Sequence, residues 1–217
     1  APLDDDDARA CTHCALGSVL GGGGACPFPN TPASWRQQMN ALQRAALRTR
    51  TGVPLLIGSD SVHGHHSLRG ATLFPHHIGQ GCMRREDQAD TLLVQKLAEI
   101  AARESAACGV NLIFSPCVAI PHDLRWGRTF ECFAEDVAIV SELAAAEVRG
   151  IQQCGVPMAA CAKHWVGDGG TELGTGSTDF AWLGAHPHVR LDQGNTLVSD
   201  AELREVHVAP YRAVLQS

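Results

Sequence analysis

Hydrophobic residues recur every three or four positions in four stretches of this chain, as expected for amphipathic helices. A proline follows Thr31, and Ser34 with Gln37 three residues later forms a possible capping box, so we predict a helix over roughly residues 31–50. Leucines, an isoleucine and alanines return at helical spacing over roughly residues 85–107, and a glycine ends that run. Both stretches are therefore predicted as helices.

The third and fourth stretches are predicted as helices on the same grounds. The third begins at Asp136, and Gly155 terminates it. Its apolar stripe consists of Val137, Val140, Ala144, Val148 and Ile151. The fourth begins at a second possible capping box, Ser199 with Glu202, and continues almost to Ser217.

Short apolar runs precede or separate these helices and are predicted as strands. They comprise Ser18–Leu20 and residues 53–58, 111–115 and 158–162. The run at 53–58 is continuously apolar, as expected for a strand that is buried on both faces. Residues 171–193 are rich in Gly, Thr and Ser and are predicted to form a functional loop.

The alternation of short strands and amphipathic helices predicts an α/β fold built on a parallel sheet. We count about four βα units in this order. A closed (β/α)8 TIM-type barrel needs eight strands and usually about 250 residues. We therefore expect the N-terminal portion of an incomplete barrel.

The composition excludes several classes of protein. With 217 residues, of which 45% are hydrophobic, the chain is able to bury one sizeable core. The net charge is -6 and the basic residues are scattered, so nucleic acid is not an expected partner. The longest apolar runs fall far short of the roughly 20 residues that cross a bilayer, and no membrane span is predicted. The nine cysteines are dispersed and odd in number, so at least one has no disulfide partner within the chain.

Candidate chemistry lies after the predicted strands, because parallel α/β barrels form their active sites where the strands end. The polar residues that we single out there are Asp60, Arg128, Lys163, His164 and Asp168. Their side chains are able to form hydrogen bonds with sugar hydroxyls. Trp126 and Trp165 lie beside them in the sequence and offer apolar faces.

Each of these residues also has a purely structural interpretation. An aspartate after a strand, such as Asp60, often caps a helix or a turn. Arg128 is equally well placed for an ion pair with Glu131 or Glu135. A lysine directly after a buried strand must find water, a carboxylate or a ligand, and this favours the functional interpretation of Lys163.

Other motifs lead to weaker hypotheses. Cys11 and Cys14 have the spacing of a zinc knuckle, but no second ligand pair follows at the spacing of a zinc finger. The glycines at 21–24 lack the lysine of a phosphate-binding loop and are predicted as an ordinary loop. A cluster of five histidines lacks carboxylates at matching spacing, so we expect it to form a hydrogen-bonded scaffold rather than a metal site. These histidines are His63, His65, His66, His76 and His77. We expect neither a metal nor a cofactor.

Taken together, the motifs resemble glycoside hydrolase family 3, in its β-glucosidase and glucan exohydrolase branch. The resemblance rests on five blocks in the order of the family, at residues 17–29, 52–75, 125–136, 160–170 and 192–211. It implies hydrolysis of terminal non-reducing β-D-glucosyl residues from β-glucosides or β-glucan oligosaccharides by a retaining mechanism. The alternative is a non-catalytic relative that at most binds sugar.

The resemblance also implies roles for single residues. Asp60, Arg128, Lys163 and His164 match the residues that bind hydroxyls of the glycosyl unit in the innermost subsite. Asp168 completes the expected substrate-binding set. It lies in a Gly-Asp-Gly-Gly loop where the branch that cleaves N-acetylglucosamine has a catalytic histidine, which favours glucosidase chemistry.

Neither catalytic carboxylate is assigned to this chain. In the family, an aspartate in a Ser-Asp-Trp context is the nucleophile, and a glutamate that usually comes from the following domain is the acid/base group, with the two about 5 Å apart in a retaining enzyme. The Ser-Asp pairs here, Ser59-Asp60 and Ser199-Asp200, lack the tryptophan. We therefore expect both groups outside residues 1–217, which would form a partial barrel domain without the later strands and the second domain. The exposed edge of such a sheet is expected to self-associate, and the family suggests secretion.

Overall fold

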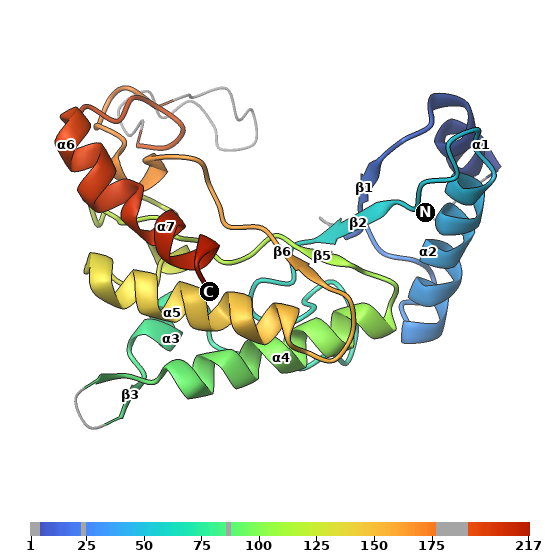
Figure 1. The fold of residues 1–217 in the computed structure, drawn as a ribbon, viewed down its shortest axis with the longest axis horizontal. Coiled ribbons are helices and arrows are strands. Elements are labelled where there is room, and N and C mark those ends of the chain that lie inside the picture. The colour runs from blue at the N-terminus through green and yellow to red at the C-terminus, as the bar shows by residue number, and fades with distance from the viewer. Residues whose placement is uncertain (1–4, 23–24, 86–87, 177–190) are drawn as a thin grey trace. The chain divides into compact units, whose positions relative to one another are not determined.

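The computed structural model describes residues 5–22, 25–85, 88–176 and 191–217 (Figure 1). The chain divides into two compact units. The first unit consists of Ala1–Phe74, Lys96–Ser115 and Gly150–Cys161. The second unit consists of Pro75–Gln95, Pro116–Arg149 and Ala162–Ser217. Within the described residues, no helix has the length and apolar character that a membrane span requires.

A parallel sheet of four strands lies in the first unit. In spatial order these strands are β1 (Ser18–Leu20), β2 (Leu56–Ser59), β5 (Leu112–Ile113) and β6 (Ala159–Ala160). Their spatial order is also their order along the chain, and the register aligns Val19 with Ile57, Gly58 with Leu112, and Ile113 with Ala160. The α/β class and the parallel sheet are confirmed, and the fold is a partial TIM-type barrel.

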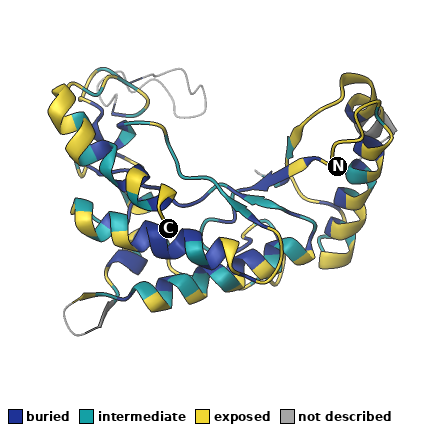
Figure 2. Cartoon of the chain, in the orientation of Figure 1, coloured by how far each residue is buried: buried dark blue, intermediate teal, exposed yellow. Residues whose placement is uncertain are grey.

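Helices connect the strands, as the alternating pattern predicts. The α-helices are α1 (Asp5–Cys14), α2 (Pro32–Leu47), α3 (His77–Gly81), α4 (Thr91–Ala107), α5 (Val137–Gln152), α6 (Asp200–Glu202) and α7 (Ala209–Leu215). The described residues also contain two 3-10 turns, η1 (Thr129–Glu131) and η2 (Asp168–Gly170), and one π-helical turn, η4 (Leu203–His207). Helix α1, which contacts α2, was not predicted, because its acidic start lacks an apolar stripe. Figure 2 colours much of α5 as buried and α6 as exposed.

The strand predicted at residues 53–58 begins later than expected and is not buried on both faces. Side chains hold the backbone of Leu55, since Gln43 contacts its N–H and its carbonyl at 2.9 Å each and the Asn111 amide donates to the same carbonyl at 3.0 Å. Val53 is 60% exposed and Leu56 is 49% exposed. Strand β1 has the predicted bounds, whereas β5 and β6 are each shorter than the predicted runs at 111–115 and 158–162.

The N-terminus of α2 corrects the predicted capping box. The Thr31 hydroxyl, not that of Ser34, caps the helix by accepting a hydrogen bond from the Ser34 N–H at 3.2 Å. Pro32 then occupies the first turn, where its missing N–H costs nothing. The helix ends at Leu47, three residues before the predicted boundary.

Helix α4 starts six residues later than predicted, at Thr91. The residues before it form an antiparallel pair, β3 (Arg84–Arg85) with β4 (Gln88–Ala89). The Asp90 carboxylate accepts a hydrogen bond from the Leu93 N–H at 3.0 Å and so supplies the helix cap. The Asp136 carboxylate does the same at the start of α5, in the position that the sequence predicts.

The last predicted helix is interrupted. Ser199 caps α6 as predicted, accepting from the Glu202 N–H at 3.2 Å. A π-helical turn follows, in which the Val208 N–H bonds to the Leu203 carbonyl five residues earlier, at 2.9 Å. Because Pro210 has no N–H and cannot continue an existing helix, a new one, α7, begins around it.

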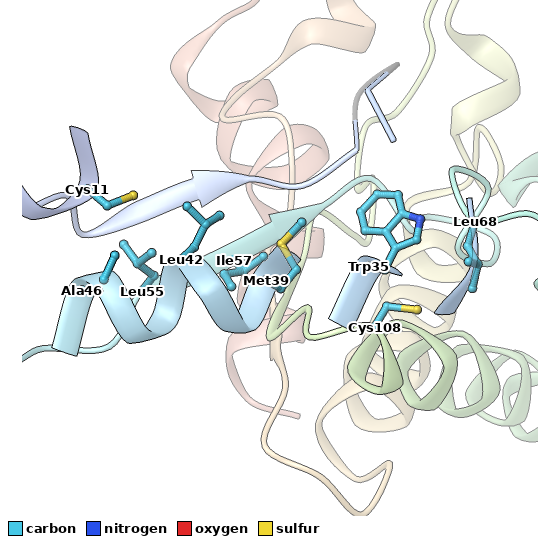
Figure 3. Close-up of a cluster of buried hydrophobic side chains, with 10 residues drawn as sticks. Cys11, Trp35, Met39, Leu42, Ala46, Leu55, Ile57, Leu68 and Cys108 are labelled. Carbon is cyan, nitrogen blue, oxygen red and sulfur yellow. The ribbon is translucent and has the colours of Figure 1, made fainter. Parts of the chain in front are cut away.

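Two clusters of buried side chains stabilise the first unit. The larger one joins α1, α2 and β2, and α2 supplies half of its residues (Figure 3). Its members are Cys11, Trp35, Met39, Leu42, Ala45, Ala46, Leu55, Ile57, Leu68 and Cys108. The second cluster packs α4 and the end of α5 around Ile113 of β5. Together the two clusters fix the strands whose ends lead into the candidate site.

Candidate functional site

Four of the five predicted site residues lie in the second unit, in segments that follow β5 and β6 in the chain. They are Arg128, Lys163, His164 and Asp168. Asp60 lies in the first unit, directly after β2, and it is partly buried. Four of the predicted residues thus belong to one compact unit and Asp60 belongs to the other.

Arg128 is held by Glu131 through two parallel hydrogen bonds. The Nε and Nη2 atoms of Arg128 donate to the two carboxylate oxygens at 2.8 Å each, across a single turn of η1. Both side chains are largely buried, at 27% and 18% exposure. The Glu131 hydrogen bonds raise the pKa of Arg128. Burial acts to raise the pKa of Glu131, but Arg128 outweighs it and lowers that pKa. The structural interpretation of Arg128 is thus confirmed with Glu131 as the partner, and the functional interpretation stays a proposal.

Lys163 is positioned by backbone hydrogen bonds. Its N–H donates to the Pro116 carbonyl at 2.9 Å, and its carbonyl accepts from the Val118 N–H at 2.8 Å. These bonds form a parallel bridge between Lys163 and Cys117. The charge of Lys163 contributes to the lowered pKa of Glu131, so the ammonium lies near that carboxylate. The peptide bond between Lys163 and His164 is cis.

The two ring nitrogens of His164 have different partners. Nδ1 lies 2.9 Å from Asp168 Oδ2, and Nε2 lies 2.8 Å from Arg128 Nη2. Hydrogen bonds with Asp168 and, less strongly, with Cys117 raise the pKa of His164 to about 9. A guanidinium only donates, so the contact with Arg128 fits a neutral ring while the raised pKa favours a protonated one. We assign the neutral ring, in which Nδ1–H donates to Asp168 and the Nε2 lone pair accepts from Arg128, because a protonated ring would place two N–H donors 2.8 Å apart.

Two buried thiols, Cys117 and Cys132, belong to the same site as His164. Cys117 and Cys132 are 1% and 1% exposed, and they pack with Ala119, Trp126 and Leu191. Hydrogen bonding with Cys132 and, less strongly, the contact with His164 lower the pKa of the Cys117 thiol. The hydrogen bond with Cys117 raises the pKa of Cys132. The site therefore contains a buried thiol, Cys117, whose proton is lost more easily than that of an ordinary buried cysteine.

A buried ion pair supports the turn that carries Glu131. The His77 side chain, at 0% exposure, contacts the Glu131 carbonyl through Nδ1 at 2.7 Å and Glu147 through Nε2 at 3.1 Å. Burial opposes the charged ring, but Glu147 outweighs this and raises the pKa of His77. Through its contact with the Glu131 carbonyl, His77 fixes the backbone of η1.

The two tryptophans differ in what they offer a ligand. Trp126 is 3% exposed, and its indole N–H donates to Asp192 at 3.0 Å, so the expectation that it presents an open apolar face is wrong. Trp165 has an edge contact with Tyr211. Its ring remains accessible, because the residue is 73% exposed. Most of the loop predicted at 171–193 lies outside the described residues, and of it only 171–176 and 191–193 are described.

Several residues of the site were not predicted. Cys117 follows the predicted strand at 111–115, and residues that follow strands were the ones examined for chemistry. It was not selected, because no local catalytic signature surrounds this cysteine. Glu147 lies within the apolar stripe of α5, and a charged residue in a buried stripe is a recognisable sign of a partner. His77 was expected in a scaffold, and its hydrogen bonds fit that role.

Metal-ligating residues gather in one place among the described residues. The donor atoms of Cys117, Glu131 and His164 all lie within 4.8 Å of one another. None of these residues belongs to the two metal hypotheses of the sequence. Cys11 packs in the core while Cys14 is exposed, so their thiols do not face a common ion.

Comparisons with known proteins extend over almost the whole chain. The family model described as the Glycosyl hydrolase family 3 N terminal domain matches residues 3–217. The lysosomal beta glucosidase of Dictyostelium discoideum is 31% identical over 179 residues, which cover 77% of this chain and 21% of that protein. The chain thus spans about a fifth of the length of this relative.

Two solved structures are similar to this chain in both sequence and fold. The exo-1,3/1,4-beta-glucanase from a Pseudoalteromonas species is 36% identical with a TM-score of 0.79, covering 96% of this chain and 25% of that one. The beta-glucosidase from Listeria innocua in complex with glucose is 30% identical with a TM-score of 0.70, covering 93% of this chain and 24% of that one. Each likeness spans nearly all of this chain and about a quarter of the other.

Proposed function

Because this chain belongs to glycosyl hydrolase family 3, we propose that it supplies the sugar-binding half of a site that hydrolyses terminal non-reducing β-D-glucosyl residues. The substrates are β-glucosides or β-glucan oligosaccharides. The observation that carries this proposal is the joined set of Arg128, Glu131, His164 and Asp168, in which every charged group is oriented by another.

This arrangement suits a pyranose ring. Arg128 and Lys163 supply cationic donors for hydroxyl oxygens, and hydrogen bonds that involve a charged partner are about twice as strong as neutral ones. His164 is proposed to contact the same sugar through its ring. Asp168 positions the His164 ring through Nδ1. Asp60 completes the proposed substrate-binding set with a carboxylate that accepts from hydroxyls. The exposed ring of Trp165 offers an apolar surface for a sugar face.

We further propose that the reaction follows the retaining mechanism, in which one carboxylate attacks the anomeric carbon and a second protonates the leaving oxygen about 5 Å away. The residues of this chain bind and orient the sugar. No residue of this chain is assigned as nucleophile or acid/base group. The Glu131 carboxylate balances part of the positive charge of Arg128 and Lys163, so the proposed site suits an uncharged, hydroxyl-rich ligand whose oxygens accept from both cations.

The test is a pair of arginine variants in glucose titrations followed by calorimetry. Arg128→Ala removes a cation of the proposed site, and Arg125→Ala removes one that forms an exposed pair with Asp123 in the same loop. We expect Arg128→Ala to weaken glucose binding by about 2 kcal/mol, roughly thirtyfold, and Arg125→Ala to leave it unchanged. Equal affinity in both variants would remove Arg128 from the site.

Hydrolysis of an aryl β-glucoside is measured on the same preparations. Glucose binding together with hydrolysis supports the proposed enzyme. Glucose binding without hydrolysis supports the alternative of a non-catalytic sugar-binding relative. Absence of glucose binding in the unmodified protein overturns both.

We also propose that the protein is secreted. The family resemblance suggests this, and a relative from Dickeya chrysanthemi is named as periplasmic. Detection of the protein in the culture medium, and not in the cytosolic fraction, is the expected outcome.

A further inference from the structure

We propose that Cys117, Glu131 and His164 form a reversible site for a divalent cation of the zinc class, and that a cation there excludes the sugar. The second part rests on the proposed function. The three donor atoms, a sulfur, a carboxylate oxygen and a ring nitrogen, lie within 4.8 Å of one another. They come from three segments, since Cys117 follows β5, Glu131 ends η1 and His164 follows β6.

The donor set matches the ligand preferences of zinc. Zinc binds thiolate at about 2.3 Å and imidazole or carboxylate at about 2.0–2.2 Å, usually with tetrahedral geometry. Donors around such an ion are about 3.3–3.6 Å apart by that geometry, so the present spacing needs shifts of about 1 Å. Hard cations such as magnesium prefer oxygen ligands and do not suit a site with sulfur and nitrogen.

The surroundings already hold two of the ligands in position. Asp168 binds His164 Nδ1 at 2.9 Å, which leaves Nε2, 2.8 Å from Arg128 Nη2, as the nitrogen available to a metal. A carboxylate on the outer nitrogen is the usual support of a metal-binding histidine. The Glu131 backbone is fixed by His77 at 2.7 Å. Such support around the ligands reduces the reorganisation that binding requires.

Arg128 is the group that a cation must displace. Its guanidinium occupies both Glu131 oxygens at 2.8 Å and lies 2.8 Å from His164 Nε2. A bound cation takes over both partners, and the Cys117 thiol proton is released to solvent as the metal–sulfur bond forms. Because Arg128 and Lys163 keep their positive charges nearby, we expect an exchangeable cation rather than a permanent structural one. With three protein ligands the fourth position stays open to water.

Sugar and cation compete in this arrangement for the same groups. His164 cannot use Nε2 for a hydroxyl and for a metal at once. Arg128 also loses the carboxylate that orients it. We therefore expect zinc to lower the apparent affinity for glucose in proportion to its own occupancy.

Cobalt(II) is the probe for the test, because a tetrahedral cobalt–thiolate site has visible d–d bands and a near-ultraviolet sulfur-to-metal band. The protein first receives Cys14→Ser, Cys26→Ser and Cys82→Ser, which remove the exposed thiols. We expect this background protein to bind one cobalt ion per chain with the thiolate spectrum. Cys117→Ser should abolish the sulfur band, and Glu131→Gln should weaken cobalt binding about tenfold or more.

Cys154→Ser is the matched control, since Cys154 is an equally buried free thiol in the first unit. It should leave the cobalt spectrum unchanged. If Cys117→Ser retains the sulfur band, or if the background protein shows no such band, the proposal is wrong. Glu131→Gln keeps the test informative if Cys117→Ser folds poorly, because unchanged affinity in Glu131→Gln also overturns the site.

Glucose is then added to the cobalt-loaded background protein. Loss of the sulfur band with increasing glucose supports mutual exclusion. Cobalt binding that glucose does not affect, in a protein that binds glucose, overturns the exclusion. Glucose binding without any cobalt site overturns the cation proposal and leaves the proposed function standing. A cobalt site without glucose binding overturns the proposed function and leaves the cation site standing.

Discussion

At the scale of single residues, the site is oriented before any ligand arrives. Arg128 and Glu131 form two parallel hydrogen bonds in a partly buried place, so the guanidinium plane is fixed at little further entropic cost. The ring of His164 is fixed in the same way by Asp168. Such preorganisation lets the energy of each hydrogen bond to a ligand appear as affinity rather than being consumed in ordering side chains.

His65 gives a residue-scale prediction about acid stability. Its side chain is 0% exposed, its ring has an edge contact with Trp35 at 4.8 Å, and neither ring nitrogen has a hydrogen-bond partner among the described residues. Burial, followed by the charge of His66, lowers the pKa of His65 to about 4, with Glu104 opposing the shift. The neutral ring is therefore the form that fits the folded state.

The pH dependence follows from this lowered pKa. The unfolded state takes up a proton near pH 6.5 and the folded state only near pH 4, so the stability contribution is present above pH 6.5 and is lost as the pH falls to 4. We expect a loss of at most about 3 kcal/mol over this window. Urea unfolding at pH 7 and pH 4.5 should show a smaller difference in His65→Leu than in the unmodified protein. The exposed His66→Leu should keep most of the difference, because burial is the larger cause of the lowered pKa of His65. An unchanged difference in His65→Leu would contradict the prediction.

At the scale of elements, periodicity predicted what depends on local sequence. The helices α2, α4 and α5 all appear, because their apolar stripes pack and an aspartate or threonine caps each start. Strand lengths were not predictable, because the Gln43 and Asn111 side chains bind the backbone of Leu55 in place of a neighbouring strand. A partner that lies twelve or more residues away leaves no trace in a local pattern.

In the candidate site, too, contacts between residues close in sequence were predictable and contacts between distant residues were not. The pairing of Arg128 with Glu131 was foreseen as one alternative, since three residues separate them. The contact of Cys117 with His164 was not, because the two come from separate strand ends and meet only in the folded chain. Assigning this chain to its family required the five ordered blocks, since no single spacing was specific enough.

The cap of α2 gives a prediction at the element scale. Thr31 accepts a hydrogen bond from the backbone of Ser34 at 3.2 Å, whereas the rejected capping box requires Gln37 to act on Ser34. We expect Thr31→Ala to lower the free energy of unfolding by about 1 kcal/mol, because one N–H at the helix start loses its acceptor. Gln37 is exposed, and Gln37→Ala should change stability by less than about 0.5 kcal/mol. If chemical denaturation showed a larger loss of unfolding free energy in Gln37→Ala than in Thr31→Ala, the capping box of Ser34 and Gln37 would be the correct interpretation.

At the scale of the whole molecule, the sheet and the charged site belong to different compact units. The parallel strands and both apolar clusters lie in the first unit, and the Arg128–His164 set lies in the second. The chain passes between the units at the ends of β5 and β6, where Ser115 and Cys161 are the last residues of the first unit. The strands therefore fix where the segments that carry Cys117 and Lys163 begin.

The edges of the sheet lead to a prediction about self-association. Strands β1 and β6 are the outer strands, and among the described residues neither pairs with another strand on its outer side. Unpaired N–H and carbonyl groups along an edge favour pairing with another chain, and Leu20 at the end of β1 adds a side chain that is 59% exposed.

We expect the purified chain to form oligomers whose proportion rises with concentration, as measured by size-exclusion chromatography with light scattering. Leu20→Lys places a charge at the edge of β1 and should shift the population towards the monomer, because a lysine on an edge strand opposes pairing. Leu124→Lys adds the same charge at a site that is 67% exposed in the second unit, and it should leave the oligomers in place. A monodisperse monomer at every concentration would show that the edges of the sheet are already protected, and equal effects of the two lysines would assign the association to net charge rather than to β1.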